Sequence, residues 1–386
     1  MKTVCIITST RAEYGLLRNI MKAFISDKDV QCDVVVTGTH LLEEYGNTYL
    51  EIEQDQIPIA KKINIMGDGN GISDVCDIMG NAVSKFGRYF EMNKPDILML
   101  LGDRYEIFSI AAAAINYRIP IAHLYGGETT EGAVDEAFRH SITKMSYLHF
   151  TATEKYRKRV IQLGEAPERV FNVGSIGIEN IRKSRLMNRP ELNDSLGFSL
   201  DGDYAVATFH PITLEYGDVK EQCRNVLDAC KSFPEIKFLF TGANADTNGK
   251  LINEMIMSEA KTTKNLFFVK SLGNIRYLSA LNYARFVLGN SSSGITEAPS
   301  FHIPTVNIGN RQKGRIQAES ILNCTTQKEQ IISSIRQALS MDCADIKNPY
   351  EKTGTTDNIV KEIKNFLNSG THNIAKPFYD LEWRTI

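Results

Sequence analysis

The sequence predicts an α/β protein with two doubly wound domains, each a parallel sheet covered by helices on both faces. Three observations predict this class. Short β-branched runs alternate with longer amphipathic stretches, most of these runs are apolar throughout, and the series occurs twice. Strands that are buried on both faces read as continuous apolar runs, which is typical of parallel sheets. A chain of 386 residues also suits two domains better than one core.

The first series supplies five predicted strands, at residues 4–7, 32–37, 97–101, 119–124 and 148–152. Between them, helical spacing of apolar residues predicts helices at 14–25, 82–92, 105–117 and 137–147. The second series supplies strands at 204–208, 237–241, 266–269, 286–288 and 305–308, again with helices between them.

The polar segment 182–203 carries Pro190 and lacks periodicity, so we place the domain boundary near it. We expect an N-terminal Rossmann-like domain over residues 1–175 and a C-terminal one over 176–365. A tail at 366–386 is expected to pack back on the N-terminal domain.

Composition excludes several classes of protein. A net charge of −2 without a basic run gives no reason to expect a nucleic-acid partner. The seven cysteines are scattered without C-x-x-C pairs, which favours reduced thiols over disulfides or a zinc site. No apolar run is long enough for a membrane span, and the first apolar run is too short for a signal peptide. We therefore expect a cytoplasmic protein without a membrane partner.

A cluster of small residues predicts an anion site in the second half. The strand at 286–288 leads into Gly-Asn-Ser-Ser-Ser-Gly, which includes Ser291 and Ser292, and then Glu297. Backbone N–H groups at such a helix start can approach a phosphate closely. Glu297 could accept the hydroxyls of a ribose, and Arg311 follows the next strand. This placement predicts a nucleotide diphosphate site and argues against a dehydrogenase, whose fingerprint lies near the N-terminus.

Polar residues also follow the predicted strands of the first half. Arg11 after the first strand suits a phosphate clamp, although a surface arginine near a helix start is an equal alternative. Asp103 and Arg104 follow a strand and a glycine, where Asp103 would project from the strand end. The alternative for Asp103 is a helix N-cap.

The loop at 126–128, Gly-Gly-Glu, leads to a helix with paired charges. Asp135 and Arg139 lie four residues apart, as do Glu136 and His140, so each pair can meet on one face. Two surface ion pairs are one interpretation. The other is a cluster of carboxylates with split pKa values, as acid–base chemistry requires.

His210 precedes a proline, which holds it extended and aims its ring outward from the strand end, although a packed structural histidine is an alternative. No cluster has metal-ligand spacing, and the sequence has no P-loop, no early G-x-G-x-x-G and no G-x-S-x-G elbow.

Seven stretches together resemble the UDP-N-acetylglucosamine 2-epimerase family, specifically its hydrolysing branch. They are TSTRAEYG, LGDRYE, GGETTEGAVDEAFRHSITKMS, VIQLGE, FHPITLE, GNSSSGITEAPSF and NIGNRQKGR, and the resemblance extends to about residue 320. It implies a GT-B-like pair of Rossmann-type domains with a central cleft, a homodimer, and neither a metal nor a nicotinamide cofactor. The implied reaction eliminates UDP to give a 2-acetamidoglucal. Water then adds with inversion at C2 and releases a free manno sugar for sialic or legionaminic acid synthesis.

The resemblance also implies roles for individual residues. Catalytic positions match Asp103, Asp135 and His210, with Arg139 alongside, and a protonated His210 would offset charge on the leaving diphosphate. Positions on the UDP side match Arg11, Arg104, Asn244, Leu272, Tyr277, Ser291, Ser292, Glu297 and Arg311.

One position departs from the family pattern. Many members read His-x-Glu-Gly-Gly where this chain has Tyr125 in place of the glutamate, so a usual catalytic acid is missing. Glu128 or Glu131 is the replacement that the loop offers, which leaves the assignment of acid and base open.

The substrate stays open between two sugars. The GGETTEGA loop and the ending Lys-Pro-Phe-Tyr-Asp-Leu resemble members that act on 2,4-diacetamido-2,4,6-trideoxyglucose (N,N'-diacetylbacillosamine) nucleotides. Hydrolysers of UDP-GlcNAc carry similar loops, and UDP is not distinguished from GDP. A GT-B glycosyltransferase that uses a UDP-sugar donor and a non-catalytic nucleotide-sugar sensor are the alternative functions.

Overall fold

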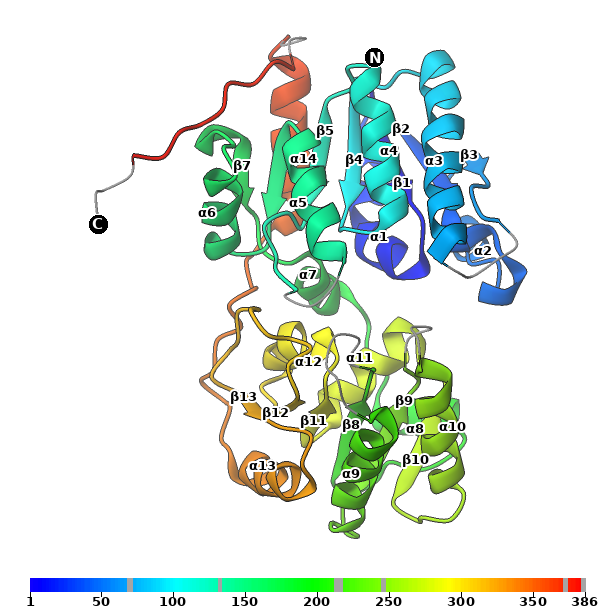
Figure 1. Ribbon diagram of the computed structural model, residues 1–386, viewed down its shortest axis with the longest axis vertical. Helices are drawn as coiled ribbons and strands as arrows, with labels where there is room; N and C mark the ends of the chain where they lie inside the picture. Colours follow the sequence, from blue (N-terminus) through cyan, green and yellow to red (C-terminus); the bar gives the residue numbers. More distant parts are fainter. Residues whose placement is uncertain (68–71, 131–133, 212–217, 244–247, 371–373, 383–386) are drawn as a thin grey trace. The chain divides into compact units, whose positions relative to one another are not determined.

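The computed structural model describes residues 1–67, 72–130, 134–211, 218–243, 248–370 and 374–382 (Figure 1). The chain forms two compact units. Unit 1 contains residues 1–128, 134–180 and the segment that begins at Lys352, and unit 2 contains mainly Ile181–Glu351. Each unit has one parallel sheet with helices packed on it, which confirms the predicted fold class.

The sheet of unit 1 has seven parallel strands in the order β3-β2-β1-β4-β5-β6-β7. These are β1 (Lys2–Thr8), β2 (Val30–Thr37), β3 (Ile59–Ile63), β4 (Ile97–Leu101), β5 (Ile121–Leu124), β6 (Leu148–Thr151) and β7 (Val170–Asn172). Its helices are α1 (Arg11–Ser26), α2 (Tyr49–Gln54), α3 (Ile72–Met92), α4 (Tyr105–Asn116), α5 (Asp135–Met145), α6 (Glu154–Gln162) and α14 (Thr355–Asn368), and α7 (Ile176–Lys183) begins within it.

Alternate residues of the central strand enter different cores, as the period of a strand requires. Val4 and Ile6 of β1 pack with apolar residues of α1 and α14. Cys5 and Ile7 pack with apolar residues of α3, α4 and α5 on the other face. Residues 4–7 of the strand are all apolar, as helices that cover both of its faces require.

The sheet of unit 2 has six parallel strands in the order β10-β9-β8-β11-β12-β13. They are β8 (Tyr204–Thr208), β9 (Lys237–Thr241), β10 (Leu266–Val269), β11 (Phe286–Gly289), β12 (Thr305–Ile308) and β13 (Ile321–Cys324). The helices of this unit are α8 (Arg189–Leu196), α9 (Val219–Lys231), α10 (Gly249–Ala260), α11 (Gly273–Tyr283), α12 (Ser292–Thr296) and α13 (Lys328–Ser340).

Both sheets have the doubly wound strand order. The chain first adds strands on one side of its first strand and then adds the remaining strands on the other side. The reversal lies between β1 and β4 in unit 1 and between β8 and β11 in unit 2. In such sheets ligands bind outside the carboxyl ends of the strands at this point.

The boundary predicted at residue 365 differs from the structure, because α14 belongs to unit 1. Ile359, Ile363 and Leu367 lie on one face of α14 and are buried in the core that contains α1. The segment after α14 also contacts unit 1, where Lys376 Nζ lies 2.7 Å from Glu165 Oε2. A search of the described residues finds no helix with the length and apolar character that a bilayer span requires.

Candidate active site

The switch point of unit 1 brings together the polar residues that follow β1 and β4. Thr10 caps α1 by accepting a hydrogen bond from the backbone N–H of Glu13. Arg11 follows in the first turn, half exposed, with its Nε 2.9 Å from Glu51 Oε1. An exposed pair of this kind contributes at most about 1 kcal/mol, so Arg11 can exchange Glu51 for an anionic ligand at small cost.

Arg139 is the centre of a charged cluster at the end of β4. Its guanidinium is buried, with 4% of the side chain exposed, and it bridges Asp103 and Glu136. Nη2 contacts Asp103, and Nη1 donates to Glu136 Oε2 at 2.9 Å. Glu136 also lies 3.2 Å from His140 Nε2, so the predicted pairing of Glu136 with His140 is confirmed. Asp103 and Glu136 both contact Arg139, and the charge of Arg139 also acts on Asp135.

Asp135 is the first residue of α5 and lies close enough to this cluster to respond to its charges. Reduced hydration and the negative charge of Asp103 raise the pKa of its carboxyl, and the guanidinium groups of Arg104 and Arg139 oppose that rise. The surroundings therefore favour the protonated form of the Asp135 carboxyl more than water does.

The turn after β5 is built around two glycines. Gly127 has φ +77°, and a Cβ there would lie 2.4 Å from the carbonyl oxygen of Tyr156, so only glycine fits without strain. Glu128, next in the chain, is buried.

Tyr125 hydrogen bonds through its hydroxyl to Ser175 Oγ at 3.1 Å, and burial raises its pKa to about 12. Tyr125 is therefore neutral near pH 7 and does not supply the negative charge of a carboxylate.

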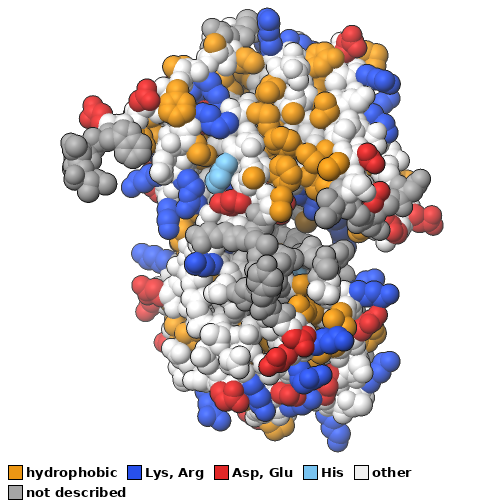
Figure 2. All heavy atoms as spheres, viewed as in Figure 1, with side chains coloured by type: hydrophobic (Ala, Val, Ile, Leu, Met, Phe, Trp, Pro, Cys, Tyr) orange, Lys and Arg blue, Asp and Glu red, His pale blue; other side chains and the backbone are white. Residues whose placement is uncertain are grey.

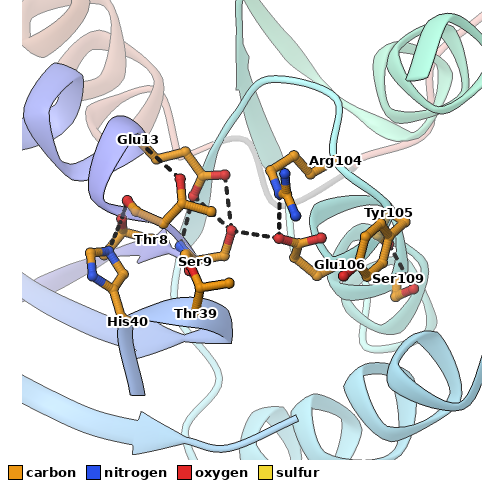
Figure 3. A network of polar contacts seen from close by, with 10 residues as sticks. Thr8, Ser9, Glu13, Thr39, His40, Arg104, Tyr105, Glu106 and Ser109 are labelled. Carbon is orange, nitrogen blue, oxygen red and sulfur yellow. Dashed lines mark hydrogen bonds and ion pairs between the residues drawn. The ribbon is translucent and has the colours of Figure 1, made fainter. Parts of the chain in front are cut away.

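A buried network beside this cluster was not predicted (Figure 3). Ser9, Glu13 and Glu106 join to Arg104, whose Nε donates to Glu106 Oε1 at 2.5 Å. Glu13 lies in the same motif as Arg11, and Glu106 lies in the same motif as Arg104. Nothing in the sequence spacing indicated that the two glutamates meet.

In unit 2, the serine cluster begins α12 as expected. Ser291 is the N-cap and accepts a hydrogen bond from the backbone N–H of Ser293. The hydroxyl of Tyr277 donates to Ser293 Oγ at 2.7 Å, and Ser293 in turn donates to Glu297. Burial raises the pKa of the Glu297 carboxyl. Two of the predicted residues, Tyr277 and Glu297, thus meet through a serine that was not predicted.

His210 follows β8 and Arg311 follows β12, the two strands that flank β11, and both residues contact Asn290 after β11. The backbone N–H of His210 donates to Asn290 Oδ1 at 2.7 Å, and Arg311 Nη1 donates to the Asn290 carbonyl at 3.2 Å. Gly289 precedes Asn290, and a Cβ there would lie 1.9 Å from the carbonyl oxygen of Thr208, so this close approach requires glycine.

Burial, and then the charge of Arg311, lower the pKa of His210 to about 3. A buried imidazole beside a guanidinium is neutral near pH 7, so these surroundings do not favour the protonated His210 that the resemblance implies.

Four further predicted residues are Leu272, Ser292, Asn244 and Glu131. Leu272 is buried at the residue before α11, the helix that carries Tyr277, and Ser292 begins α12. Asn244 and Glu131 lie outside the described residues. Among the residues that the structure describes, no group of three or more His, Cys, Asp or Glu side chains could hold a metal ion.

Two Rossmann-like units, each with one parallel sheet, define a GT-B-like α/β protein. The model of the family described as UDP-N-acetylglucosamine 2-epimerase matches residues 22–364, and the chain belongs to this family of nucleotide-sugar 2-epimerases.

Relatives and solved structures agree with this membership. The chain is 40% identical to polysialic acid biosynthesis protein P7 of Escherichia coli, over 99% of this chain and 98% of that protein. It is 41% identical to the GDP/UDP-N,N'-diacetylbacillosamine 2-epimerase (hydrolyzing) of Campylobacter jejuni, over 83% and 84%. The structure of the UDP-GlcNAc 2-epimerase of Neisseria meningitidis bound to UDP-GlcNAc superposes with a TM-score of 0.79. That superposition covers 95% of this chain and 100% of that chain at 18% identity, and it supports the fold alone.

Proposed function

We propose that this chain is a hydrolysing 2-epimerase. It removes UDP from UDP-GlcNAc or from UDP-2,4-diacetamido-2,4,6-trideoxyglucose and releases the free manno sugar. The relative from Campylobacter jejuni, and one from Legionella pneumophila that is 34% identical over 94% of this chain, are both named as hydrolysing enzymes. These names support the hydrolysing outcome and a bacillosamine-type substrate.

The observation that carries the proposal is the cluster of carboxylates around buried Arg139 at the end of β4. The C2–H bond of the sugar is weakly acidic, so its cleavage needs a positioned base. In the first step a carboxylate takes this proton, the C1–O bond breaks, and its electron pair leaves with the diphosphate. In the second step water adds its oxygen at C1, and a proton returns to C2 from the opposite face.

Asp103 and Asp135 are the proposed carriers of the C2 protons, because they are close enough for the charge of Asp103 to raise the pKa of Asp135. A raised pKa keeps a carboxyl group available as a proton donor nearer to neutral pH. Glu128, buried after the glycine turn, is the proposed replacement for the acid that Tyr125 displaces.

The remaining polar residues are proposed to hold UDP. Ser291, Ser292 and Arg311 of unit 2 would bind the diphosphate, and the neutral His210 would contribute an N–H donor to it. Arg11 and Arg104 of unit 1 are proposed as phosphate-binding arginines.

The nucleoside is proposed to bind along α11 and α12. Glu297 would accept hydrogen bonds from the ribose hydroxyls, and Tyr277 and Leu272 would hold the uracil. Asn244, in the adjoining loop, is also proposed to lie on the UDP side. No metal or nicotinamide cofactor has a part in this proposal.

A side-by-side turnover assay tests the function. The purified chain is incubated with each of the two candidate sugars as its UDP and its GDP form, and products are separated by anion-exchange chromatography. We expect a free manno sugar and a nucleoside diphosphate from one substrate. A UDP-linked manno sugar would contradict hydrolysis. An intact donor that is consumed only when an acceptor is added would indicate a glycosyltransferase, and binding without any turnover would indicate a sensor.

An apolar surface supports the homodimer. Figure 2 shows apolar side chains gathered on the face of unit 1 that carries α3, α4 and α5. Val83 is 41% exposed and Ile115 is 39% exposed, and the rings of Phe108 and Phe138 meet beside them across α4 and α5. Exposed patches of this kind commonly mark interfaces between proteins. We therefore propose that two copies meet on this face, in the cytoplasm where nucleotide sugars are used.

Mass measurement by light scattering tests this interface. We expect the chain to elute as a dimer and Ile115→Glu to elute as a monomer, because the charge would be buried in the interface. The matched control is Met257→Glu, at a similarly exposed methionine of α10 in unit 2, which should stay dimeric. A monomeric parent chain, or an unchanged mass for Ile115→Glu, would contradict the proposed interface.

A further inference from the structure

Two glutamates from different helices are buried side by side at the switch point of unit 1 (Figure 3). Glu13 on α1 is 5% exposed and Glu106 on α4 is 2% exposed. Their elements follow β1 and β4, which pair in the sheet, so the fold holds the two carboxyl groups at one place. Two ionised carboxylates in such a site would repel each other strongly.

The hydroxyl group of Ser9 lies between the two carboxyl groups. Ser9 Oγ is 2.9 Å from Glu13 Oε1 and 3.0 Å from Glu106 Oε1, and both distances are those of hydrogen bonds. A serine hydroxyl has one proton and can donate to only one of these oxygens. A proton on one of the carboxyl groups would give the second contact a hydrogen of its own. One extra proton would therefore complete this bridge.

The partners of each carboxyl group indicate where that proton lies. Glu106 Oε1 also accepts from Arg104 Nε at 2.5 Å, which favours an ionised Glu106. Glu13 Oε2 accepts from the Ser9 backbone N–H at 2.7 Å and lies 3.0 Å from Ser9 Oγ. Oε1 lies 2.9 Å from Ser9 Oγ and is the oxygen to which we assign the proton. Burial, and then the charge of Glu106, raise the pKa of Glu13 to about 7. The chain of donors thus runs from Glu13 through Ser9 to Glu106, where Arg104 donates from the other side.

We propose that Glu13 and Glu106 share a single proton through Ser9 and that this shared proton controls the charge beside Arg104. With the proton, the two carboxyl groups and the guanidinium have no net charge. Without it, they carry one negative charge. Glu13, Ser9 and Glu106 are then positioning residues for Arg104, and the neutral state is the one that accepts an anion.

The surrounding ionisable groups leave this count unchanged near neutral pH. Those that face the network from neighbouring elements are Tyr105 on α4, Asp135 on α5, His40 and the Arg11–Glu51 pair. The pKa of Tyr105 is raised and that of His40 is lowered to about 4, mainly by burial, so both are neutral, and Arg11 and Glu51 offset each other. Asp135 adds negative charge that favours retention of the shared proton.

Infrared difference spectroscopy on the full chain tests the shared proton without any nucleotide. A protonated carboxylic acid has a C=O stretch that is separate from carboxylate bands. We expect this band at about pH 6, its loss at about pH 9, and its absence in Glu13→Gln. A wild-type spectrum that matches Glu13→Gln at both pH values would overturn the proposal. If Glu13→Gln fails to fold, Ser9→Ala serves instead, because it removes the bridging hydroxyl group. A band in Ser9→Ala that keeps the wild-type position and pH dependence would also overturn the proposal.

Calorimetric binding of UDP tests the consequence for Arg104, which rests on the proposed function. We expect wild-type affinity to fall by about tenfold from about pH 6 to about pH 9, and Glu13→Gln to lose this dependence because its amide has no charge to gain. An unchanged pH dependence in Glu13→Gln would refute the link to Arg104. Failure of UDP to bind at any pH would count against the proposed function, while the infrared band would still decide the shared proton.

Discussion

Replacing Arg139 by lysine should separate two carboxylates that one guanidinium now holds. Nη1 donates to Glu136 Oε2 at 2.9 Å, and Nη2 contacts Asp103. A lysine has a single compact ammonium group that cannot span both carboxylates in this geometry. The positive charge stays in place, so the substitution changes the arrangement of the cluster more than its net charge.

The structure bounds the size of this effect. A hydrogen bond to a charged group contributes about 1.5–3 kcal/mol, and each 1.4 kcal/mol changes a rate about tenfold. Solvent reduces the effect because the Asp103 and Glu136 side chains are 24% and 27% exposed. We therefore expect kcat/KM for release of free sugar to fall by about 10- to 100-fold. The free energy of unfolding should fall by only about 1 kcal/mol.

Two measurements check this prediction. Free sugar is quantified over time by chromatography, and unfolding is followed in urea. Arg185→Lys is the matched control, because Arg185 is 89% exposed and its contact with Glu191 should tolerate lysine. Turnover of Arg139→Lys at the parental rate would refute a role for the guanidinium bridge, and equal losses in both variants would show that the assay reports a general effect.

Three further predictions concern stability. Gly127→Ala should lower the free energy of unfolding by about 2 kcal/mol or more, because φ is positive there and a carbonyl oxygen blocks the new methyl group. The control is Gly87→Ala within α3, which should be neutral or stabilising in the same urea titration. Lys376→Met should cost about 2 kcal/mol, since it removes one of several partners of the fully buried Glu165; an unchanged melting temperature would contradict this. Below about pH 6.5 an unfolded histidine takes up a proton that His210 in the folded chain, with its pKa near 3, does not. Stability should therefore fall as the pH falls from about 6.5 towards 3, and His210→Gln should flatten that slope.

Much of the fold follows from local patterns in the sequence. Each predicted strand became a strand of a parallel sheet, because apolar runs such as residues 97–101 are buried on both faces. The edge strands β3, β7 and β13 were missed. Ile59–Ile63 reads Ile-Ala-Lys-Lys-Ile with exposed lysines, since an edge strand keeps one side towards water and lacks the apolar signal. The sequence did not predict that α14 packs on unit 1. The spacing of its apolar residues shows that the helix has an apolar face but does not show which core contacts that face.

Site residues were predictable by position and less so by chemical state. Parallel strands place their ends at one edge of a sheet, so Asp103 and Arg311 could be assigned to strand ends before the fold was known. The neutral state of His210 depends on burial and on Arg311, which approach it only in the folded chain. The Ser9 bridge joins Glu13 to a residue far along the chain, and only the pairing of β1 with β4 brings them together.

Incorporation of solvent deuterium tests the central claim most directly. The chain is incubated in D2O with the substrate that the turnover assay selects, and the products are analysed by NMR. Removal of the C2 proton, loss of UDP and hydration predict a free manno sugar that carries deuterium at C2. Recovery of a free sugar that retains its original C2 proton and gluco configuration would contradict the proposed mechanism, because a simple glycosidic hydrolysis would then explain the release of UDP.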